Sequence, residues 1–246
     1  MSSKQSNLTD QYKKKGFIVI RKFLNKKNLA KILLDFKKVK CQKYLDRNGR
    51  IRRYENFYNK TIELNRLNIK ILKLLKNLFK SDFVIFKDKL NLKPPGGEGF
   101  SAHYDGIFYF KIKNKKFKGW YEYANKFYNV LIPLDDSNKL NGTIQIAKED
   151  KKGFLSLYKN TTKDGTPNLL RSFEKKKKFE NINMKKGDVC IFSNRCAHRS
   201  NKNKSKSSRR ILYYTYNKKM DGNNYKKYFN DKSKSSNKIK ALTGEI

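Results

Sequence analysis

The stretch from residue 83 to residue 217 constrains the fold most, because short strand-like runs follow one another there with polar turns between them. Apolar and polar residues alternate in FVIFKDKLNLK (residues 83–93) and in RRILYYTYN (residues 209–217). This period of two predicts strands with one buried face. Further runs occupy residues 100–110, 127–136, 142–147 and 187–192. Since no helical repeat is interleaved with them, we expect a sandwich or jelly roll and not a parallel α/β sheet.

The flanking regions read differently. After a β-branched run at residues 16–20, apolar residues recur at helical spacing in residues 24–40 and 61–80. Residues 46–56 between them are polar and predict a loop or lid. Residues 218–246 are polar and poorly patterned, which predicts a surface tail that is partly disordered. We expect one domain over residues 1–246, with mostly helical support at 1–80, a jelly-roll core at 81–217 and a polar tail at 218–246.

The formal net charge of +39 has two interpretations. A strongly basic chain often has a polyanionic partner such as nucleic acid. A/T-rich codons also supply Lys and Asn, and here the lysines are spread along the whole chain. We favour the second interpretation, because phosphate-binding sites often use the bidentate fork of Arg, which is sparse here. No specific nucleic-acid partner is therefore expected, although the charge would favour an anionic small substrate.

Three cysteines, at positions 41, 190 and 196, show no paired spacing and fit a reducing interior. The first residues contain no apolar stretch typical of a signal peptide. No apolar run approaches the ~18 residues that a membrane span needs. These features predict a cytoplasmic protein without a membrane partner.

The chain contains two histidines, His103 and His198. His103 and Asp105 are two residues apart in SAHYDG, so on a strand their side chains would project from the same face. His198 is the remaining histidine that could join them in a 2-His-1-carboxylate site of the kind that binds Fe(II). A His-x-Asp pair alone does not distinguish this site from an ordinary hydrogen-bonded histidine.

An arginine lies eleven residues after the second histidine. Alternation along residues 209–217 places Arg209 on one face of the strand and Arg210 on the other. One interpretation is that one of them faces the interior, where it would need a carboxylate partner such as a dicarboxylate cosubstrate. The other is that both are solvated at a strand edge.

Taken together, these segments resemble the phytanoyl-CoA dioxygenase (PhyH-like) family of Fe(II)/2-oxoglutarate-dependent oxygenases. The resemblance runs through YKKKGFIVIRKFL (12–24), KLNLKPPGGEGFSAHYDG (89–106), IPLDDSNKLNGTIQIA (132–147) and GDVCIFSNRCAHRSNKNKSKSSRRILYYTYN (187–217). It implies a double-stranded β-helix fold and a dioxygenase that uses O2 and 2-oxoglutarate to hydroxylate a C–H bond, yielding succinate and CO2.

The resemblance also implies roles for particular residues. Fe(II) would be held by His103, Asp105 and His198. Arg209, helped by the hydroxyl of Ser200, would bind the distal carboxylate of 2-oxoglutarate. Asn91 occupies a position where family members contact the cosubstrate, Lys87 lies on the same strand face, and Tyr109 is expected to wall the pocket.

One segment departs from the family pattern: AKED (147–150) stands where many relatives have Gly-Ser-His. The departure affects the local turn and the substrate-side wall, not the metal ligands. Because the aspartate of His-x-Asp is present, a halogenase is disfavoured.

The substrate is expected to be a small polar, anionic metabolite, for example an organophosphonate, because PPGGEGF and YKKYFNDK look most like bacterial members with such substrates. Arg195, Arg199 and Arg210 flank the site in sequence and would either contact an anionic group or be ordinary surface charge. Two alternatives are a non-catalytic basic nucleic-acid-binding or interaction protein on a jelly-roll scaffold, and an enzyme of this fold that modifies a nucleic acid or a protein side chain.

Overall fold

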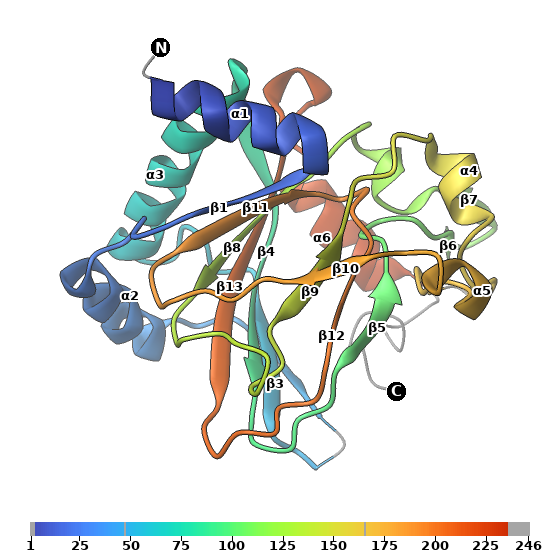
Figure 1. Ribbon diagram of the computed structural model, residues 1–246. Helices are drawn as coiled ribbons and strands as arrows, with labels where there is room; N and C mark the ends of the chain where they lie inside the picture. The colour runs from blue at the N-terminus through green and yellow to red at the C-terminus, as the bar shows by residue number, and fades with distance from the viewer. Residues whose placement is uncertain (1–2, 47, 165, 236–246) are drawn as a thin grey trace.

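Two antiparallel sheets face one another in the computed structural model, which describes residues 3–46, 48–164 and 166–235 (Figure 1). The larger sheet has the strand order β1-β11-β8-β13-β4-β3-β2, and the smaller has the order β10-β9-β12-β5. Apolar side chains from both sheets meet between them, including Leu131, Ile146 and Phe192. The prediction of a mainly β, jelly-roll core is confirmed.

The element bounds place most predicted strands within a few residues. The strands are β1 (Phe17–Ile20), β2 (Gln42–Leu45), β3 (Ile51–Glu55), β4 (Phe83–Lys93), β5 (Phe100–His103), β6 (Phe110–Ile112), β7 (Lys115–Phe117), β8 (Tyr128–Pro133), β9 (Ile144–Ala147), β10 (Phe179–Asn181), β11 (Val189–Ser193), β12 (His198–Ser200) and β13 (Arg209–Lys218). The α-helices are α1 (Ser3–Lys15), α2 (Lys26–Lys38), α3 (Ile62–Phe79), α4 (Phe154–Tyr158), α5 (Arg171–Glu174) and α6 (Tyr225–Lys234), with short 3-10 turns at Gly119–Glu122 and Lys219–Asp221.

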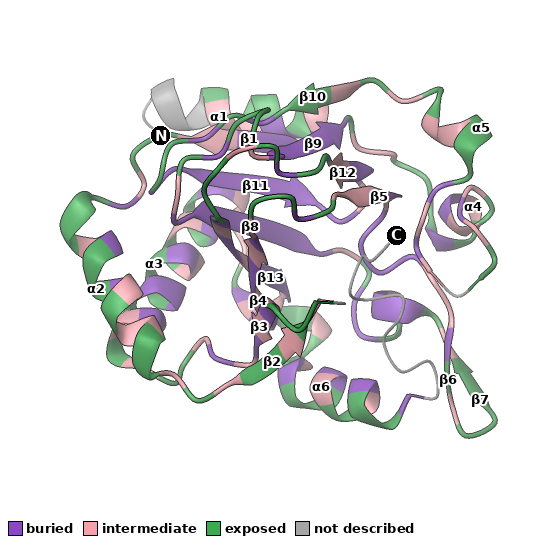
Figure 2. Ribbon diagram, turned by 90° about the horizontal axis from the view of Figure 1, so that it is seen from below, coloured by how far each residue is buried: buried purple, intermediate pink, exposed green. Residues whose placement is uncertain are grey.

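Helices α2 and α3 support the larger sheet from outside. Each begins at a side-chain cap. The side-chain Oδ1 of Asn25 accepts a hydrogen bond from the Asn28 N–H, and the Thr61 hydroxyl accepts one from the Leu64 N–H. Their apolar sides join the outer face of the sheet in one buried cluster. Figure 2 shows the resulting contrast between the buried strands β8 and β11 and the exposed outer side of α2. None of the described helices is long and apolar enough to cross a membrane.

Alternation along β4 and β13 gives the larger sheet two chemically different faces. The two strands pair antiparallel, with Leu212 opposite Leu90 and Arg209 opposite Lys93. Leu90 and Leu212 point outward into the cluster with the helices. Lys89 lies between the outward positions of β4 and lines a cavity inside the sandwich. The inner face of these strands is therefore polar although it lies in the interior.

Within the expected loop or lid at residues 46–56, residues 51–55 form strand β3, which pairs with β2. Strand β3 pairs with β4, which places Arg53 opposite Asn91 and extends the larger sheet. Both Arg53 and Glu55 are buried, with 4% and 0% of their surface exposed. The loop prediction was wrong because the residues of β3 that point inward are charged, which in a sequence resembles a solvated segment.

The expected polar tail also contains an ordered element. Helix α6 packs against β4 near the cavity, and it buries Tyr225, Tyr228 and Lys232. Residues 225–234 of the predicted polar surface tail thus form an ordered helix, and its buried positions recur at helical spacing. Residues 236–246, which the same prediction covered, lie outside the described residues.

Candidate metal centre and its cavity

His103, Asp105 and His198 converge inside the sandwich. One ligand atom from each lies within 4.8 Å of the other two. His198 opens β12 directly opposite His103, at the end of β5. Its Nε2 lies 3.6 Å from the Asp105 Oδ2. Two imidazoles and one carboxylate are the donor set that Fe(II) oxygenases use, so these residues fit that ion.

Asp105 reaches the centre from a turn and not from a strand. Strand β5 ends at His103, and Gly106 has a φ of 79°, a conformation that favours glycine. A Cβ at Gly106 would lie 2.6 Å from the Cβ of Trp120, so the close packing of that indole also requires glycine here. The expected pairing of His103 with Asp105 is present, although a turn and not strand alternation produces it.

Backbone carbonyls orient both imidazoles. The Nδ1 of His103 lies 2.7 Å from the Ser101 carbonyl, and the Nδ1 of His198 lies 3.1 Å from the Cys196 carbonyl. Since a carbonyl can only accept, each Nδ1 carries the proton and each Nε2 keeps its lone pair for a metal. Burial lowers the pKa of His103 to about 3, and it also lowers the pKa of His198. Both rings are thus held in the neutral form that coordinates metals.

A buried chain of side chains fixes the carboxylate. Asn129 on β8 donates from Nδ2 to the Asp105 Oδ2 at 2.9 Å, and Thr215 on β13 donates to the Asn129 Oδ1 at 2.8 Å. The threonine contact orients the amide so that its NH2 faces Asp105. Neither Asn129 nor Thr215 was predicted from the sequence. The available signal was a polar Asn within the otherwise apolar run at residues 127–134.

The cavity beside the centre is lined mainly by basic and aromatic side chains. Arg53, Lys87, Lys89 and Arg199 contribute to its wall, whereas Asp105 is the one acidic residue in the lining among those the structure describes. The predicted contact residues Asn91, Lys87 and Ser200 all line this cavity. The structure thus brings them to the same space as His103 and His198.

Arg209 and Lys93 form a buried cationic pair beside this cavity. Each is 1% exposed, and they face one another across β13 and β4. The Arg209 guanidinium donates to the Gly142 carbonyl at 2.6 Å, and its Nε has no partner. Lys93 donates to the Ser200 hydroxyl at 2.8 Å and the Asn201 carbonyl at 2.6 Å, which connects the pair to the cavity wall. Burial, followed by the charge of Arg209, lowers the pKa of Lys93 to about 6.

Neither cation has an acidic partner within hydrogen-bond distance in the described part of the chain. Of the two arginines that open β13, Arg209 is therefore the interior one. Arg210 points the other way and forms a bidentate pair with Asp135 at 2.7 and 2.9 Å. Lys93 was missed by the sequence analysis, because one lysine among many carries no distinguishing pattern.

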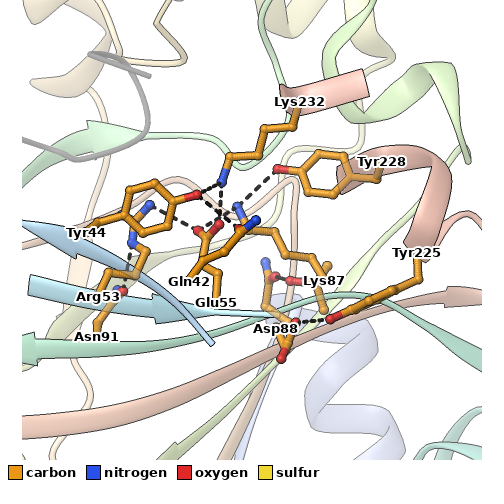
Figure 3. A network of polar contacts seen from close by, with 12 residues as sticks. Gln42, Tyr44, Arg53, Glu55, Lys87, Asp88, Asn91, Tyr225, Tyr228 and Lys232 are labelled. Carbon is orange, nitrogen blue, oxygen red and sulfur yellow. Dashed lines mark hydrogen bonds and ion pairs between the residues drawn. The ribbon is translucent and has the colours of Figure 1, made fainter. Parts of the chain in front are cut away.

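Lys87 belongs to a buried network around Glu55 (Figure 3). Glu55 lies 3.4 Å from Arg53 and 4.0 Å from Lys87, and it also accepts from Lys232 of α6. The Lys87 ammonium donates to the Tyr228 hydroxyl at 3.2 Å. Although burial opposes ionisation, the three cations lower the pKa of Glu55 to about 2. Helix α6 thus supplies both a charge and a hydroxyl to the network that lies behind Arg53 and Lys87.

Four residues that were predicted to contact the cosubstrate or the substrate pack against or bond to other residues of the protein. Tyr109 does not line the cavity; its ring packs against Phe154 and Tyr158, because the strand expected at residues 100–110 stops at His103 and the chain turns away. Arg195 donates to the Tyr121 hydroxyl and the Asn125 carbonyl, away from the lining. Arg210 is held by Asp135, as described above.

Arg199 is the fourth. It borders the cavity, but its guanidinium is committed to Glu174 at 2.7 Å and Gln145 at 2.7 Å and stacks on Phe179. The surface-charge interpretation therefore describes Arg195 and Arg210, and the side chain of Arg199 has acidic and amide partners of its own.

The departure from Gly-Ser-His has a visible structural role. Asp150 accepts a hydrogen bond from the Tyr104 hydroxyl and pairs with Lys177 at 2.5 Å. Tyr104 lies between the two ligands of the His-x-Asp segment and is fully buried. Asn168 forms an isolated β-bridge with His103. Thr166, Pro167 and Asn168 line the cavity, which the sequence did not predict.

Comparisons with known proteins agree with this geometry. A 2-aminoethylphosphonate dioxygenase from an uncultured bacterium is 27% identical over 238 residues, covering 90% of this chain and 85% of that protein. A methylphosphonate hydroxylase from Gimesia maris is 29% identical over 163 residues, covering 66% of this chain and 56% of that protein.

Solved structures show the same fold. The epimerase SnoN, in complex with Fe3+, alpha ketoglutarate and nogalamycin RO, superposes with a TM-score of 0.66 at 15% identity, covering 88% of this chain and 84% of that chain. EctD from S. alaskensis with 2-oxoglutarate and 5-hydroxyectoine superposes with a TM-score of 0.66 at 15% identity, covering 90% of this chain and 77% of that chain. The expected double-stranded β-helix is thereby confirmed. The phytanoyl-CoA dioxygenase (PhyH) family pattern matches residues 12–211, and the chain belongs to this family of Fe(II)- and 2-oxoglutarate-dependent dioxygenases.

Proposed function

We propose that this dioxygenase hydroxylates a C–H bond of a small anionic metabolite of the organophosphonate class. The observation that carries the proposal is the joint placement of a His-Asp-His cluster and a cavity whose lining is basic. The first feature supports the redox chemistry, and the second supports the charge of the substrate. Two relatives whose names specify phosphonates support the same class.

In this proposal His103, Asp105 and His198 hold Fe(II). The ion, once bound, supplies the chemistry by which O2 and 2-oxoglutarate oxidise the substrate, with succinate and CO2 as products. The chain itself keeps both imidazoles neutral and aims their Nε2 atoms at one point. Asn129 holds the Asp105 carboxylate in place from behind.

Arg209, with Lys93 and the hydroxyl of Ser200, binds the distal carboxylate of 2-oxoglutarate. A buried guanidinium without a carboxylate partner is costly, and a carboxylate offers a bidentate partner for it. The free Nε of Arg209 supports this role. Asn91, which lines the cavity two residues before Lys93, provides a further polar contact for the cosubstrate.

The test is anaerobic titration of the protein with Fe(II) and 2-oxoglutarate. The wild type should develop the weak visible charge-transfer band of such complexes and should form succinate when oxygen is admitted. His198→Ala and Asp105→Ala should lose the band and lower turnover by at least ~10³-fold, as expected when the several kcal/mol supplied by a metal are lost.

Two further variants sharpen this test. Arg209→Ala should weaken 2-oxoglutarate binding by about 10- to 100-fold, the value of a hydrogen bond between charged groups, while iron still binds. Asp135→Ala removes a carboxylate that pairs with Arg210 away from the cavity, and it should leave the band unchanged. A wild-type protein that gives neither band nor succinate would contradict the proposal.

A further inference from the structure

Lys89 is a cation at the metal centre that lacks a polar partner. It lies on the inner face of β4, lines the cavity, and packs its ammonium over the ring of Tyr213 at 4.8 Å. It makes no hydrogen bond or ion pair with any residue in the described ranges. The neighbouring inner lysines differ, since Lys87 contacts Tyr228 and Lys93 contacts Ser200.

The surroundings of Lys89 call for an anion that the chain does not provide. Lys89 is half-buried in the cavity wall, where Arg53 and Lys87 are also basic, so an opposite charge bound in this cavity would be favoured. Burial lowers the pKa of Lys89 to about 7, and among its charged neighbours Asp105 opposes this most. Asp105, however, is turned to His198 and to the amide of Asn129. The partner of Lys89 is therefore an anion from outside the chain.

The cosubstrate does not supply this anion at its distal end. Lys93, which borders the Arg209 subsite, lies four residues further along β4, which corresponds to roughly 13 Å of extended strand. The Lys89 position instead faces the part of the cavity that contains the metal centre, Arg53 and Lys87. Two anion subsites thus lie along one strand, with Asn91 between them.

The same lining disfavours a cationic group on the substrate. Apart from Asp105, no acidic side chain of the described residues lines the cavity. Glu55 is fully buried and already surrounded by Arg53, Lys87 and Lys232. An ammonium bound here would lie among like charges and would have no free carboxylate to meet it.

Resting on the proposed function, we propose that Lys89 anchors the phosphonate head of the substrate and that the cavity selects phosphonates without an ammonium group. Lys89 is thus a specificity-determining residue. The proposal separates two substrate types that have the same head group and differ at the other end: alkylphosphonates and aminoalkylphosphonates.

The experiment compares two isosteric probes, propylphosphonate and 2-aminoethylphosphonate. Each is titrated calorimetrically into the full-length protein loaded with Ni(II) and 2-oxoglutarate, so that no turnover occurs. We expect propylphosphonate to bind the wild type at least about tenfold more tightly, which is the effect of one unpaired charge at a conservative value. Lys89→Met and Lys89→Gln should weaken propylphosphonate binding about tenfold or more, and Lys89→Arg should retain most of it.

Controls make the outcomes distinct. Lys206→Met removes an exposed lysine and should change neither titration. The affinity for 2-oxoglutarate should stay within about twofold in the Lys89 variants, because the loss of a remote charge has little effect on an anchored carboxylate. The anchor role is overturned if both neutral variants bind propylphosphonate as the wild type does, or if they weaken 2-oxoglutarate instead.

The selectivity is overturned if 2-aminoethylphosphonate binds more tightly than its isostere. If neither phosphonate binds to a protein that still shows the iron–2-oxoglutarate band and forms succinate, this inference fails while the dioxygenase chemistry stands. If the band itself is absent, the failure belongs to the proposed function.

Discussion

The two faces of the larger sheet are formed by the same strands but carry different side chains, apolar on the outer face and charged on the inner face. On β4 and β13 the outward residues Leu90, Leu212 and Tyr214 pack under the helices in the main apolar cluster. The inward residues of the same two strands include Lys89, Lys93 and Arg209, which lie at the cavity or beside it. A period of two thus separates the residues that hold the fold together from those that bind charge.

This separation has energetic consequences. Burying a leucine side chain contributes about 1.5–3 kcal/mol to folding. A buried cation without a full partner works against folding and is retained where binding needs it. The outer face is expected to determine stability, and the inner face is expected to determine affinity. The predictions below test whether the two faces are that independent.

The largest effect on stability is expected on the outer face. Leu212 is fully buried, so Leu212→Ala should lower the free energy of unfolding by about 2–5 kcal/mol through lost burial and the cavity left behind. Urea unfolding followed by circular dichroism measures this loss. The affinity of the folded variant for 2-oxoglutarate should not change. Lys89→Met should instead leave the free energy of unfolding unchanged and weaken the binding of propylphosphonate. If Leu212→Ala also lost affinity for 2-oxoglutarate, the two faces would not be independent.

An intermediate effect is expected where the inner face supports the metal centre. Asn129→Ala removes the amide that holds Asp105, which should weaken metal affinity about 10- to 100-fold. Competition with a chelator measures this change. Thr215→Val removes only the group that orients the amide, and it should show a smaller loss in the same assay. Equal affinities in all three proteins would show that the carboxylate needs no support.

The smallest effect concerns pH. Burial and the neighbouring Arg209 lower the pKa of Lys93 to about 6, so in the free protein Lys93 is mostly neutral above that pH. A bound carboxylate favours the protonated form and raises this pKa. The contribution of Lys93 to 2-oxoglutarate affinity is therefore fully present below about pH 6, and it is lost as the pH rises through the raised pKa of the complex.

Calorimetry in buffers of different ionisation enthalpy would detect the proton taken up on binding. Lys93→Met should abolish that uptake and should weaken binding below about pH 6 by up to tenfold, leaving the contribution of Arg209, which stays charged. Proton uptake that persists in Lys93→Met would assign the titration to another group.

The sequence predicted those strands in which apolar residues alternate with polar ones, so that one face is apolar. Strand β4 was predicted with its observed bounds, since most of its outward residues are apolar, with Asp88 as an exception. His103, Asp105, His198 and Arg209 were identified because histidines are scarce and the family motif fixes their order. The convergence of the first three could not follow from composition, because it depends on the pairing of β12 with β5.

Two of the remaining errors have one physical origin, which is charge in the interior. Strand β3 was interpreted as a loop because Arg53 and Glu55 look solvated until the cavity and its counter-charges are known. Helix α6 was interpreted as a tail because its buried Lys232 has a partner far away in sequence. Tyr109 was misplaced for a different reason: the strand ends at His103, and the turn at Asp105 and Gly106 directs the chain away from the cavity.

The bond between Lys232 and Glu55 joins residues that are 177 positions apart. During synthesis, 177 residues must be added after Glu55 before Lys232 can reach it, so this contact forms later than contacts between residues that are closer in sequence. Lys232 also lies beyond residues 12–211, the part that carries the family signature. Substitutions in α6 can therefore change the charge network around Glu55, which holds Arg53 and Lys87 of the cavity wall, without changing the family motifs.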